Sequence, residues 1–366
     1  MNKMGAQNLT VIKPGGTIGI LGGGQLGRMI AMAAARLGYK SHIYCPDRRS
    51  PAFQTAHQFT IAEYEDEESL EVFAKSVDVV TYEFENVPAQ TADIVARHTL
   101  LRPGANALKV AQDRLVEKDF LNDSGVKTAP YAAFTTREEL DVAIKTIGRP
   151  CVAKTRRFGY DGKGQMMIKA RADIDNVLEV TAGAPAILEG FIKFDREISV
   201  IVARSESGDV AAFPVGENVH TDHILDTTKI PATLKPAIEA KAKVMATRIA
   251  NALEYIGILT VEMFVVDATN EVIVNEIAPR VHNSGHWTIE GAVTSQFEQH
   301  VRAICGLPLG SPVAKGRVEM KNLLGEDILE YEKYLLDETA HFHHYGKLEP
   351  RKGRKMGHVT WVFENE

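Results

Sequence analysis

Residues 260–277, TVEMFVVDATNEVIVNEI, constrain the fold most, because they predict two apolar strands joined by a tight turn near DATN. Pairing of these strands places Glu262 opposite Asn275 or Glu276, with Cβ atoms about 5 Å apart. Two carboxylates that close among apolar neighbours repel each other, which favours protonation of one of them. A divalent cation removes this cost, and magnesium is the natural candidate because it shares carboxylate oxygens with phosphate and water. The alternative is an edge hairpin on which both carboxylates face solvent.

The chain before residue 110 alternates strand and helix signals. Strands are predicted at 17–22, 40–45 and 78–84, and a helix is predicted at 25–37. This rhythm is typical of a parallel sheet covered by helices, and the unit closes where RPGAN interrupts the pattern near residue 103.

Beyond residue 110 the strands read as antiparallel. A helix is predicted at 111–125, where Gly125 provides a natural cap. Short strands follow it, at 150–156, 165–170, 186–192 and 196–204. A long helix at 232–254 then leads into the hairpin. The sequence therefore predicts a parallel α/β unit followed by an α+β part.

Composition and charge exclude some classes of partner. A net charge of −6 over 366 residues gives no general attraction to nucleic acid or to an anionic membrane. Cys45, Cys151 and Cys305 are odd in number and far apart, which predicts reduced thiols rather than disulfides or a zinc motif. No run approaches the roughly 20 apolar residues of a membrane helix, and residues 1–16 contain no apolar signal core. We expect a cytoplasmic protein of two or three packed units.

A glycine-rich turn follows the first predicted strand. Gly22, Gly24 and Gly27 have the G-x-G-x-x-G spacing, and Asp47 lies about 20 residues further on, as a dinucleotide site requires. A tight strand-to-helix turn without any ligand explains the same glycines equally well. The motif alone therefore leaves a nicotinamide-dependent oxidoreductase open as a rival.

A second glycine-rich loop, RRFGYDGKGQ at 156–165, follows Lys154. Its glycines free the backbone, and Arg156, Arg157 and Lys163 supply positive charge, which together suit a lid over a polyphosphate. It is not a Walker loop, because G-x-x-x-x-G-K-[ST] is absent. The alternative is a long exposed hairpin turn.

Two further segments carry many polar groups. APRVHNSGHWT, directly after Glu276, places several directional side chains beside the predicted metal, although His286 and Trp287 could equally pack in the core. The tail HHYGKLEPRKGRKMGH is locally basic. Such a run is usually a solvated face, but it could also hold a substrate phosphate, and the pattern alone does not decide.

The segments GGGQLGRM, GYDGKGQ, NEIAPRVHNSGHWT and GRKMGH, in this order, resemble the N5-carboxyaminoimidazole ribonucleotide synthetase family, the ATPase subunit type of phosphoribosylaminoimidazole carboxylase. The resemblance covers residues 17–361, and NEIAPRVHNSGHWT is its most specific part. It implies a Rossmann-like domain at 17–110, a lid domain at 111–193 and a C-terminal ATP-grasp domain at 194–366, after an N-terminal extension at 1–16. ATP would lie between the last two domains.

The resemblance also implies roles for residues of this chain. Lys154, Arg280 and His282 would be catalytic, and Glu262 and Glu276 would hold Mg²⁺. Contacts with ATP are implied for Arg114, Lys154, Gly159, Tyr160, Asp161, Gly162, Lys163, Gly164, Gln165, Glu189, Gly190, Phe191, Ile192, Glu197, His220, Asn275 and Glu276. Contacts with the ribonucleotide or the bicarbonate-derived group are implied for Gly24, Gln25, Leu26, Tyr160, Asp161, Arg280, His282, Asn283, Ser284, Lys347 and Arg354.

The implied activity is an ATP- and bicarbonate-dependent carboxylation of the exocyclic amine of 5-aminoimidazole ribonucleotide, through carboxyphosphate. The cofactors would be ATP and Mg²⁺, and the partners small molecules rather than nucleic acid or membrane. A homodimer, possible coupling to the N5-carboxyaminoimidazole ribonucleotide mutase and a role in purine biosynthesis are implied too. The rivals are another ATP-grasp ribonucleotide ligase, the oxidoreductase and a non-enzymatic binding module.

Overall fold

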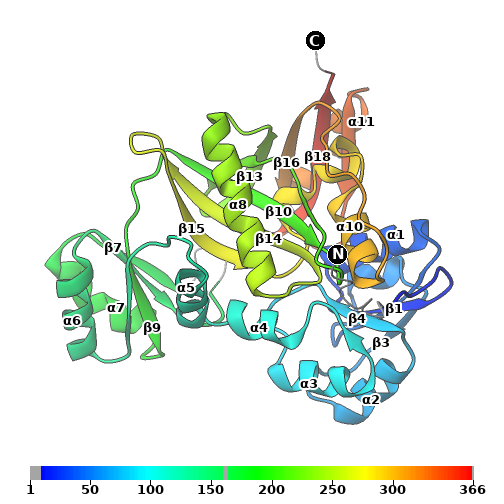
Figure 1. The fold of residues 1–366 in the computed structure, drawn as a ribbon, viewed down its shortest axis with the longest axis horizontal. Coiled ribbons are helices and arrows are strands. Elements are labelled where there is room, and N and C mark those ends of the chain that lie inside the picture. Colours follow the sequence, from blue (N-terminus) through cyan, green and yellow to red (C-terminus); the bar gives the residue numbers. More distant parts are fainter. Residues whose placement is uncertain (1–9, 160–163, 365–366) are drawn as a thin grey trace, which may run out of the picture.

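A five-stranded parallel sheet forms the N-terminal unit of the chain, whose computed structural model describes residues 10–159 and 164–364 (Figure 1). Its strand order is β3-β2-β1-β4-β5. The strands are β1 (Thr17–Leu21), β2 (Lys40–Tyr44), β3 (Gln58–Thr60), β4 (Val79–Tyr82) and β5 (Leu100–Leu101). The helices of this unit are α1 (Gln25–Arg36), α2 (Glu67–Lys75), α3 (Ala89–His98) and α4 (Ala105–Ala111). All four strand pairs are parallel, which confirms the predicted α/β rhythm.

The predicted helix at 111–125 is wrong at its start. Helix α4 ends at Ala111, and a separate helix, α5 (Arg114–Asp123), begins after Asp113. The Asp113 carboxylate accepts hydrogen bonds from the backbone N–H of Leu115 at 3.0 Å and Val116 at 3.4 Å. An aspartate is a better N-cap than an interior helix residue, so it starts a new helix here instead of continuing the old one.

A small antiparallel sheet follows, at the left of Figure 1. Its strand order is β6-β9-β7-β8, and helices α6 and α7 belong to the same unit. The bounds are β6 (Tyr131–Phe134), α6 (Arg137–Ile147), β7 (Cys151–Thr155), β8 (Gln165–Ile168), α7 (Ile174–Val180) and β9 (Ala186–Gly190). Phe134, Leu140 and Leu188 belong to a core cluster made only of residues from this unit.

The third sheet has nine strands, all antiparallel as predicted, in the order β15-β14-β10-β12-β13-β16-β18-β17, with β11 beside β10. Its strands are β10 (Arg196–Arg204), β11 (Val210–Ala212), β12 (Gly216–Thr221), β13 (Ile224–Ile230), β14 (Gly257–Val266), β15 (Glu271–Ala278), β16 (Arg317–Leu324), β17 (Ala340–His344) and β18 (Lys355–Phe363). Its helices are α8 (Pro236–Ala252), α9 (Thr288–Gly291), α10 (Gln296–Ile304) and α11 (Tyr331–Leu335).

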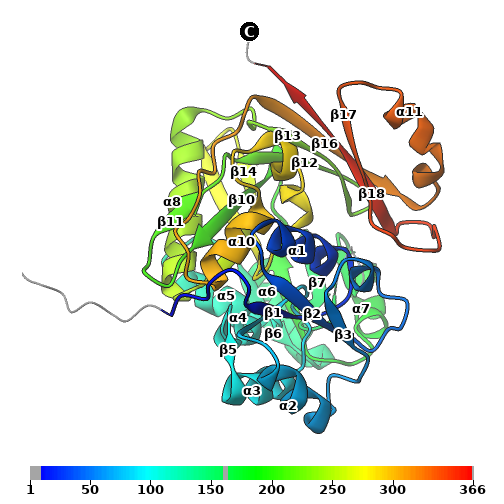
Figure 2. The ribbon, with the colours of Figure 1, turned by 90° about the vertical axis from the view of Figure 1, so that its right-hand side faces the viewer.

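The N-terminal unit and the large sheet share a core, whereas the small sheet does not. Helix α1 packs against α10, and Ile18 of β1 belongs to the same buried cluster as Phe297 and Ile304 of α10. In Figure 2 these two helices lie next to each other near the centre of the molecule. Because the small sheet has its own core, it is the unit best suited to move as a lid.

Candidate active site

A cleft of about 880 Å³ lies where the three units meet. Its wall includes Glu189 from the small sheet, Glu262 and Glu276 from the large sheet, and Glu85 from the end of the N-terminal sheet. Long-range folding therefore assembles the cleft from all three units, and of these four residues only Glu85 was not predicted from the sequence.

The two predicted metal ligands face each other across the hairpin. Glu262 of β14 pairs with Glu276 of β15, and a β-bulge follows between Glu262 and Met263. Their side chains are 18% and 39% exposed, and both line the cleft. The hairpin does lie at the edge of the sheet, where β15 is the outermost strand, but both carboxylates line the cleft instead of facing bulk solvent, as the alternative required.

The carboxyl pair has unequal proton affinity. Desolvation, with the Glu276 charge second, raises the pKa of Glu262 above its ordinary value. Desolvation also acts on Glu276, but the charges of Arg114 and Lys154 outweigh it and lower the pKa of that carboxyl. The pair thus has the electrostatics of a cation site, in which one carboxylate is ionised and the other is poised to lose its proton.

Cations from two elements surround this pair. Arg114 Nη1 lies 3.0 Å from Glu276 Oε2, and Lys154 Nζ lies 3.2 Å from Glu189 Oε2. Lys118, which the sequence reasoning missed, bonds the Asn275 carbonyl at 2.8 Å and lies 3.3 Å from Glu189. Its position one helical turn after Arg114 was the signal that could have found it.

Glu117, also missed, is buried beside Glu276. Its Oε1 accepts the backbone N–H of Ile277 at 2.7 Å. Desolvation and the charge of Glu276 raise the pKa of Glu117 to about 8. This carboxyl therefore anchors the backbone next to the second metal-ligand candidate.

The segment predicted to hold the nucleotide base also lines the cleft. Gly190, Phe191 and Ile192 line it at the end of β9, and Phe194 and Phe264 stack with ring centroids 4.5 Å apart. The backbone N–H groups of Gly190 and Phe191 are already bonded to the carbonyls of Pro130 and Pro150. This wall offers aromatic surface to a planar base.

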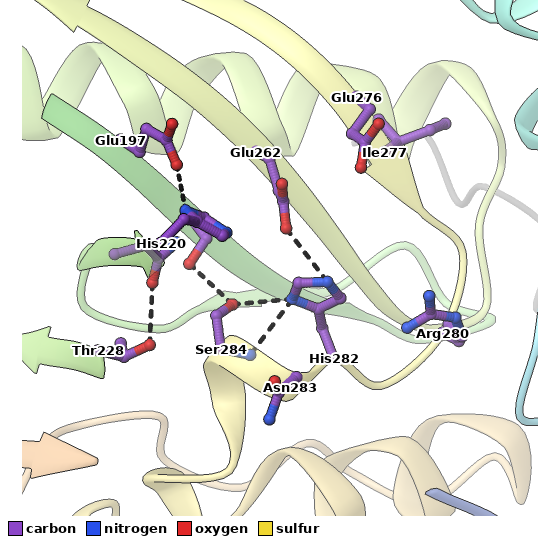
Figure 3. Close-up of polar contacts among 12 residues, drawn as sticks. Glu197, His220, Thr228, Glu262, Glu276, Ile277, Arg280, His282, Asn283 and Ser284 are labelled. Atoms are coloured by element: carbon purple, nitrogen blue, oxygen red, sulfur yellow. Dashed lines mark hydrogen bonds and ion pairs between the residues drawn. The ribbon is translucent and has the colours of Figure 1, made fainter. Parts of the chain in front are cut away.

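Glu197 and His220 form an ion pair in the cleft lining (Figure 3). Desolvation lowers the proton affinity of His220, but its bond to Glu197 and the charge of that carboxylate outweigh this, so the pKa of His220 is raised. Both side chains line the cleft, as predicted.

Only the ends of the glycine-rich lid loop can be placed. Tyr160, Asp161, Gly162 and Lys163 lie outside the described residues. Gly159 and Gln165 line the cleft. Gly164 has φ +68°, and a Cβ there would lie 2.6 Å from the Thr155 hydroxyl, so this position requires glycine.

The two arginines predicted to give the lid loop its charge are bonded to the start of α5. Arg156 Nε and Nη2 donate to the Asp113 carboxylate at 2.9 and 2.7 Å. Arg157 Nη2 donates to Gln112 Oε1 at 2.8 Å. Both guanidinium groups therefore tie the loop to the α4–α5 junction in this structure.

The segment after Glu276 combines site and core residues (Figure 3). Arg280 Nη2 lies 3.2 Å from Glu85 Oε1, and His282 Nε2 lies 3.2 Å from Glu262 Oε1. Desolvation, and next the charge of Arg280, lowers the pKa of His282 well below its usual range. His286 and Trp287 are at most 1% exposed. Of the two alternatives, they therefore pack in the core and do not face the site.

The Asn283 amide is already paired, which the prediction did not include. Its Nδ2 and Oδ1 bond the amide of Asn322 reciprocally, both at 2.8 Å. Asn322 in turn donates to the carbonyl of Leu225 at 2.8 Å. Asn283 lines the cleft, yet its side chain mainly fastens the loop to the large sheet.

The glycine turn holds a carboxylate of the protein itself. Glu83, directly after β4, accepts hydrogen bonds from the backbone N–H of Gly24 and, at 2.6 Å, from that of Gly27. Glu83 therefore occupies the anion position at the start of α1 that a dinucleotide pyrophosphate would need. Gln25 is partly exposed beside it, whereas Leu26 is 8% exposed and belongs to the core.

The basic tail returns to this turn. Gln54 donates to the Gly346 carbonyl at 3.1 Å, and Lys347 Nζ donates to the Lys355 carbonyl at 2.7 Å. Arg354 Nη1 bonds the carbonyl of Glu349 at 3.0 Å. Lys355, absent from the predicted site, lines the main cleft. Lys347 and Arg354 are not among the residues that line this cleft, so their role at a substrate phosphate stays a prediction.

A second polar cluster, away from this cleft, joins Glu290, His343 and His358, whose possible ligand atoms lie within 4.8 Å of one another. The two imidazole rings stack with centroids 4.3 Å apart and planes inclined by 5°. Lone pairs in parallel rings do not converge on one ion. Hydrogen bonds explain the cluster better: His343 Nε2 lies 2.9 Å from Glu290 Oε1, and His358 Nδ1 lies 3.0 Å from the Tyr345 hydroxyl.

Comparison with known proteins gives the class first. Residues 119–297 match the model of the ATP-grasp domain, 16–112 that of the ribonucleotide synthetase preATP-grasp domain, and 319–366 that of the phosphoribosylaminoimidazole carboxylase C-terminal domain. With paired carboxylates and cations in the cleft, the chain is an ATP-grasp ligase.

The chain belongs to the N5-carboxyaminoimidazole ribonucleotide synthase family. It is 48% identical to the Brucella melitensis synthase, covering 96% of this chain and 98% of the relative, and 42% identical to that of Bacillus subtilis, covering 97% and 94%. The Staphylococcus aureus synthetase complexed with ADP superposes with a TM-score of 0.93 at 37% identity, covering 99% and 96%. The Aspergillus clavatus synthase in complex with ADP and 5-aminoimidazole ribonucleotide gives 0.90 at 31%, covering 96% and 94%. This membership and Glu83 in the glycine turn overturn the oxidoreductase alternative.

Proposed function

We propose that this chain uses ATP and bicarbonate to carboxylate the exocyclic amine of 5-aminoimidazole ribonucleotide, giving N5-carboxyaminoimidazole ribonucleotide, ADP and phosphate in purine biosynthesis. One observation carries the proposal: Glu262 and Glu276 lie opposite each other on paired strands, in a cleft that Arg114 and Lys154 also line. Relatives at 48% and 42% identity are named for this product.

Glu262 and Glu276 would hold Mg²⁺. Two hard oxygen donors from facing strands fit a divalent cation, because burial and then the charge of Glu276 raise the pKa of Glu262 when no cation is bound. When bound, the metal neutralises charge on the phosphates of the nucleotide. The Asn275 carbonyl is held by Lys118, so this segment of β15 is fixed in place before any ligand arrives.

ATP would lie between the small sheet and the large sheet. Arg114 and Lys154 would meet its phosphates, the 189–192 segment its base, and Glu197 its ribose, with His220 beside it. The lid loop, including the predicted residues 160–163, would close over the phosphates. Closure is chemically necessary, because carboxyphosphate is labile in water. The separate core of the lid unit supports such a movement.

The chemistry needs alignment rather than a protein nucleophile. A bicarbonate oxygen forms a bond to the γ-phosphorus of ATP while the bond to the ADP oxygen breaks. The bond between the carboxyl carbon and the bridging oxygen of carboxyphosphate then breaks, which releases carbon dioxide and phosphate. The substrate amine forms a bond to the carbon of carbon dioxide and loses one proton. Arg280 and His282, which line the cleft next to Glu262, would orient bicarbonate and its product, with Ser284 at their base and Asn283 in the wall.

The ribonucleotide phosphate would bind where the tail meets the N-terminal unit. Lys347 and Arg354 would supply the charge, and the turn at Gly24 and Gln25 would lie beside it, with Leu26 packed beneath in the core. The influence of Glu83 on the pKa of Lys347 supports their proximity. Tyr160 and Asp161 of the lid loop would complete this site.

We further propose the domain bounds 17–110, 111–193 and 194–366, which the three sheets support because each falls within one range. Within the described residues, no helix is long and apolar enough to cross a membrane, and all three cysteines are free and buried. These features support a cytoplasmic enzyme that works on small molecules. From the family resemblance we propose a homodimer whose product passes to the N5-carboxyaminoimidazole ribonucleotide mutase.

ADP production tests the proposal. It should require both bicarbonate and 5-aminoimidazole ribonucleotide for its full rate and should stop without Mg²⁺. A different ribonucleotide amine that supports faster ADP formation would assign the chain to another ligase. Sedimentation velocity tests the homodimer, and a monomer at micromolar concentration would contradict it.

A further inference from the structure

A chain of side chains connects strand β10 to the first metal-ligand candidate (Figure 3). Ser199 Oγ donates to Ser284 Oγ at 2.9 Å, Ser284 Oγ lies 2.9 Å from His282 Nδ1, and His282 Nε2 lies 3.2 Å from Glu262 Oε1. Ser199 is 2% exposed and Ser284 is 1% exposed. Ser199 belongs to none of the sites predicted from the sequence.

The direction of these hydrogen bonds fixes the proton on the ring. The backbone N–H of Ser284 points at His282 Nδ1, 3.3 Å away, and an amide N–H can only donate. His282 Nδ1 must therefore carry the lone pair, and the ring proton of the neutral imidazole then lies on Nε2. Ser199 donates to Ser284 and so leaves the Ser284 hydroxyl proton for Nδ1. The Nδ1 lone pair is thus shared by two donors of Ser284, the hydroxyl and the backbone N–H.

We propose that Ser199 and Ser284 are positioning residues that hold His282 as its Nε2–H tautomer, so that His282 turns its N–H toward Glu262 Oε1, 3.2 Å away. This assignment rests on the proposed function for its catalytic meaning, but not for its geometry. While the network holds, neither ring nitrogen can take up a proton from the substrate amine, because Nδ1 faces Ser284 and Nε2 already carries hydrogen. His282 thus orients a carboxylate rather than acting as a base.

The position of Glu262 explains why such an arrangement is useful. A carboxylate that binds a metal holds its geometry better when a second group bonds it, and loss of such a group typically costs 10- to 100-fold in metal affinity or activity. Ser199 comes from β10, an interior strand paired with β14 opposite Glu262 itself. The relay therefore links the histidine to the same rigid sheet that carries the carboxylate.

Nitrogen spectroscopy tests the tautomer directly. Enzyme labelled with ¹⁵N-histidine is examined by long-range ¹H–¹⁵N correlation, and His282 is assigned from the signals lost in His282→Gln. We expect the Nε2–H pattern in the wild type. The Ser199→Ala/Ser284→Ala double variant keeps the backbone N–H of residue 284 and loses only the hydroxyl bond to Nδ1, so its Nδ1 signal should move downfield, toward that of a less strongly hydrogen-bonded nitrogen. A wild-type Nδ1–H pattern, or an Nδ1 signal that does not move in the double variant, overturns the proposal. This readout does not depend on turnover, so it stands apart from any failure of the proposed function.

Two substitutions of His282 separate its nitrogens kinetically. A glutamine amide reaches the position of Nε2 and can donate there, whereas an asparagine amide reaches only that of Nδ1. We expect His282→Gln to keep at least about 10-fold more kcat than His282→Asn, with the KM for ATP within about twofold. A kcat for His282→Asn equal to or higher than that for His282→Gln would refute the role of Nε2–H as a hydrogen-bond donor.

The serine relay needs a matched control. Ser199→Ala should lower kcat about 3- to 10-fold, within the range for a supporting hydrogen bond. Ser205→Ala replaces another buried serine, just beyond the far end of β10, whose hydroxyl bonds Ser207 instead. It should leave kcat unchanged. Equal losses in both variants, or none in Ser199→Ala at an unchanged unfolding midpoint, would show that Ser199 has no role in positioning His282.

Discussion

Lys347 carries the sharpest prediction about the ribonucleotide site. Its Nζ donates to the Lys355 carbonyl at 2.7 Å and lies 5.8 Å from the centroid of the Tyr345 ring. Desolvation, followed by the charge of Arg354, lowers the pKa of Lys347 to about 8, although Glu83 acts in the opposite direction. The ammonium charge is therefore present below about pH 8 and lost as the pH rises through that value.

The magnitude follows from the charge. A hydrogen bond to a charged group contributes about 1.5–3 kcal/mol, so Lys347→Ala should raise the KM for the ribonucleotide about 10- to 150-fold at pH 7. The KM for ATP should change by less than about twofold, since Lys154 and Arg114 supply the nucleotide site. In the wild type the ribonucleotide KM should rise above pH 8, approaching about tenfold per pH unit. In Lys347→Ala this rise should be absent.

The assay is steady-state ADP formation at saturating ATP and bicarbonate, with the ribonucleotide varied between pH 7 and 9. Lys352→Ala is the control, because Lys352 is an exposed lysine of the same tail. It should behave as the wild type. Equal increases in both KM values for Lys347→Ala would place the tail outside the substrate site. A wild-type KM that stays flat to pH 9 would refute the electrostatic argument.

Three other changes test separate parts of the structure. Glu276→Gln should reduce ADP formation at least about 100-fold while the fold stays intact; undiminished turnover at limiting Mg²⁺ would sink the metal assignment. Glu206→Ala removes the only carboxylate paired with Arg102 among the described residues; Arg102 is 5% exposed, lies 2.7 Å from Glu206 and keeps its bond to the Ile304 carbonyl. Urea unfolding should show a loss of about 3 kcal/mol, and a loss below about 1 kcal/mol would mean that the pair does not stabilise the fold. Gly27→Ala brings a Cβ within 2.9 Å of the Gly22 carbonyl, which should lower the free energy of unfolding by about 1–3 kcal/mol. It should raise the KM for the ribonucleotide but not that for ATP. A ribonucleotide KM equal to that of the wild type would show that this turn does not contact the substrate.

The parts of the site that local pattern determines were predictable. A short turn fixes the register of a hairpin, so the sequence placed Glu262 opposite Asn275 or Glu276, and the structure has Glu276 there. The bulge after Glu262 was not predictable, because it depends on how β14 fits between two neighbours. The break at Asp113 was missed because the apolar periodicity of 111–125 hides a capping signal.

The parts that depend on distant segments needed either the fold or the resemblance. Nothing in DVVTYEF indicates that Glu83 will reach the glycine turn; only the parallel pairing of β1 with β4 brings it there. The Arg280–Glu85 contact likewise joins residues from different units. Conversely, the physics of the hairpin predicted a cation, whereas the identity of the substrate came from NEIAPRVHNSGHWT and the tail. Local chemistry thus predicted the metal pair, and family resemblance predicted the ribonucleotide.

Ion pairing within the cleft has a consequence for how ligands bind together. Arg114, a predicted phosphate contact, is paired with Glu276, a predicted metal ligand, at 3.0 Å. A cation that takes Glu276 releases the guanidinium for the phosphates, and phosphates that take Arg114 release the carboxylate for the cation. Binding of either ligand breaks the Arg114–Glu276 ion pair. When both ligands bind, this cost arises once and not twice. Mg²⁺ and ATP should therefore each raise the affinity for the other by the same factor, and Arg114→Ala should reduce that factor.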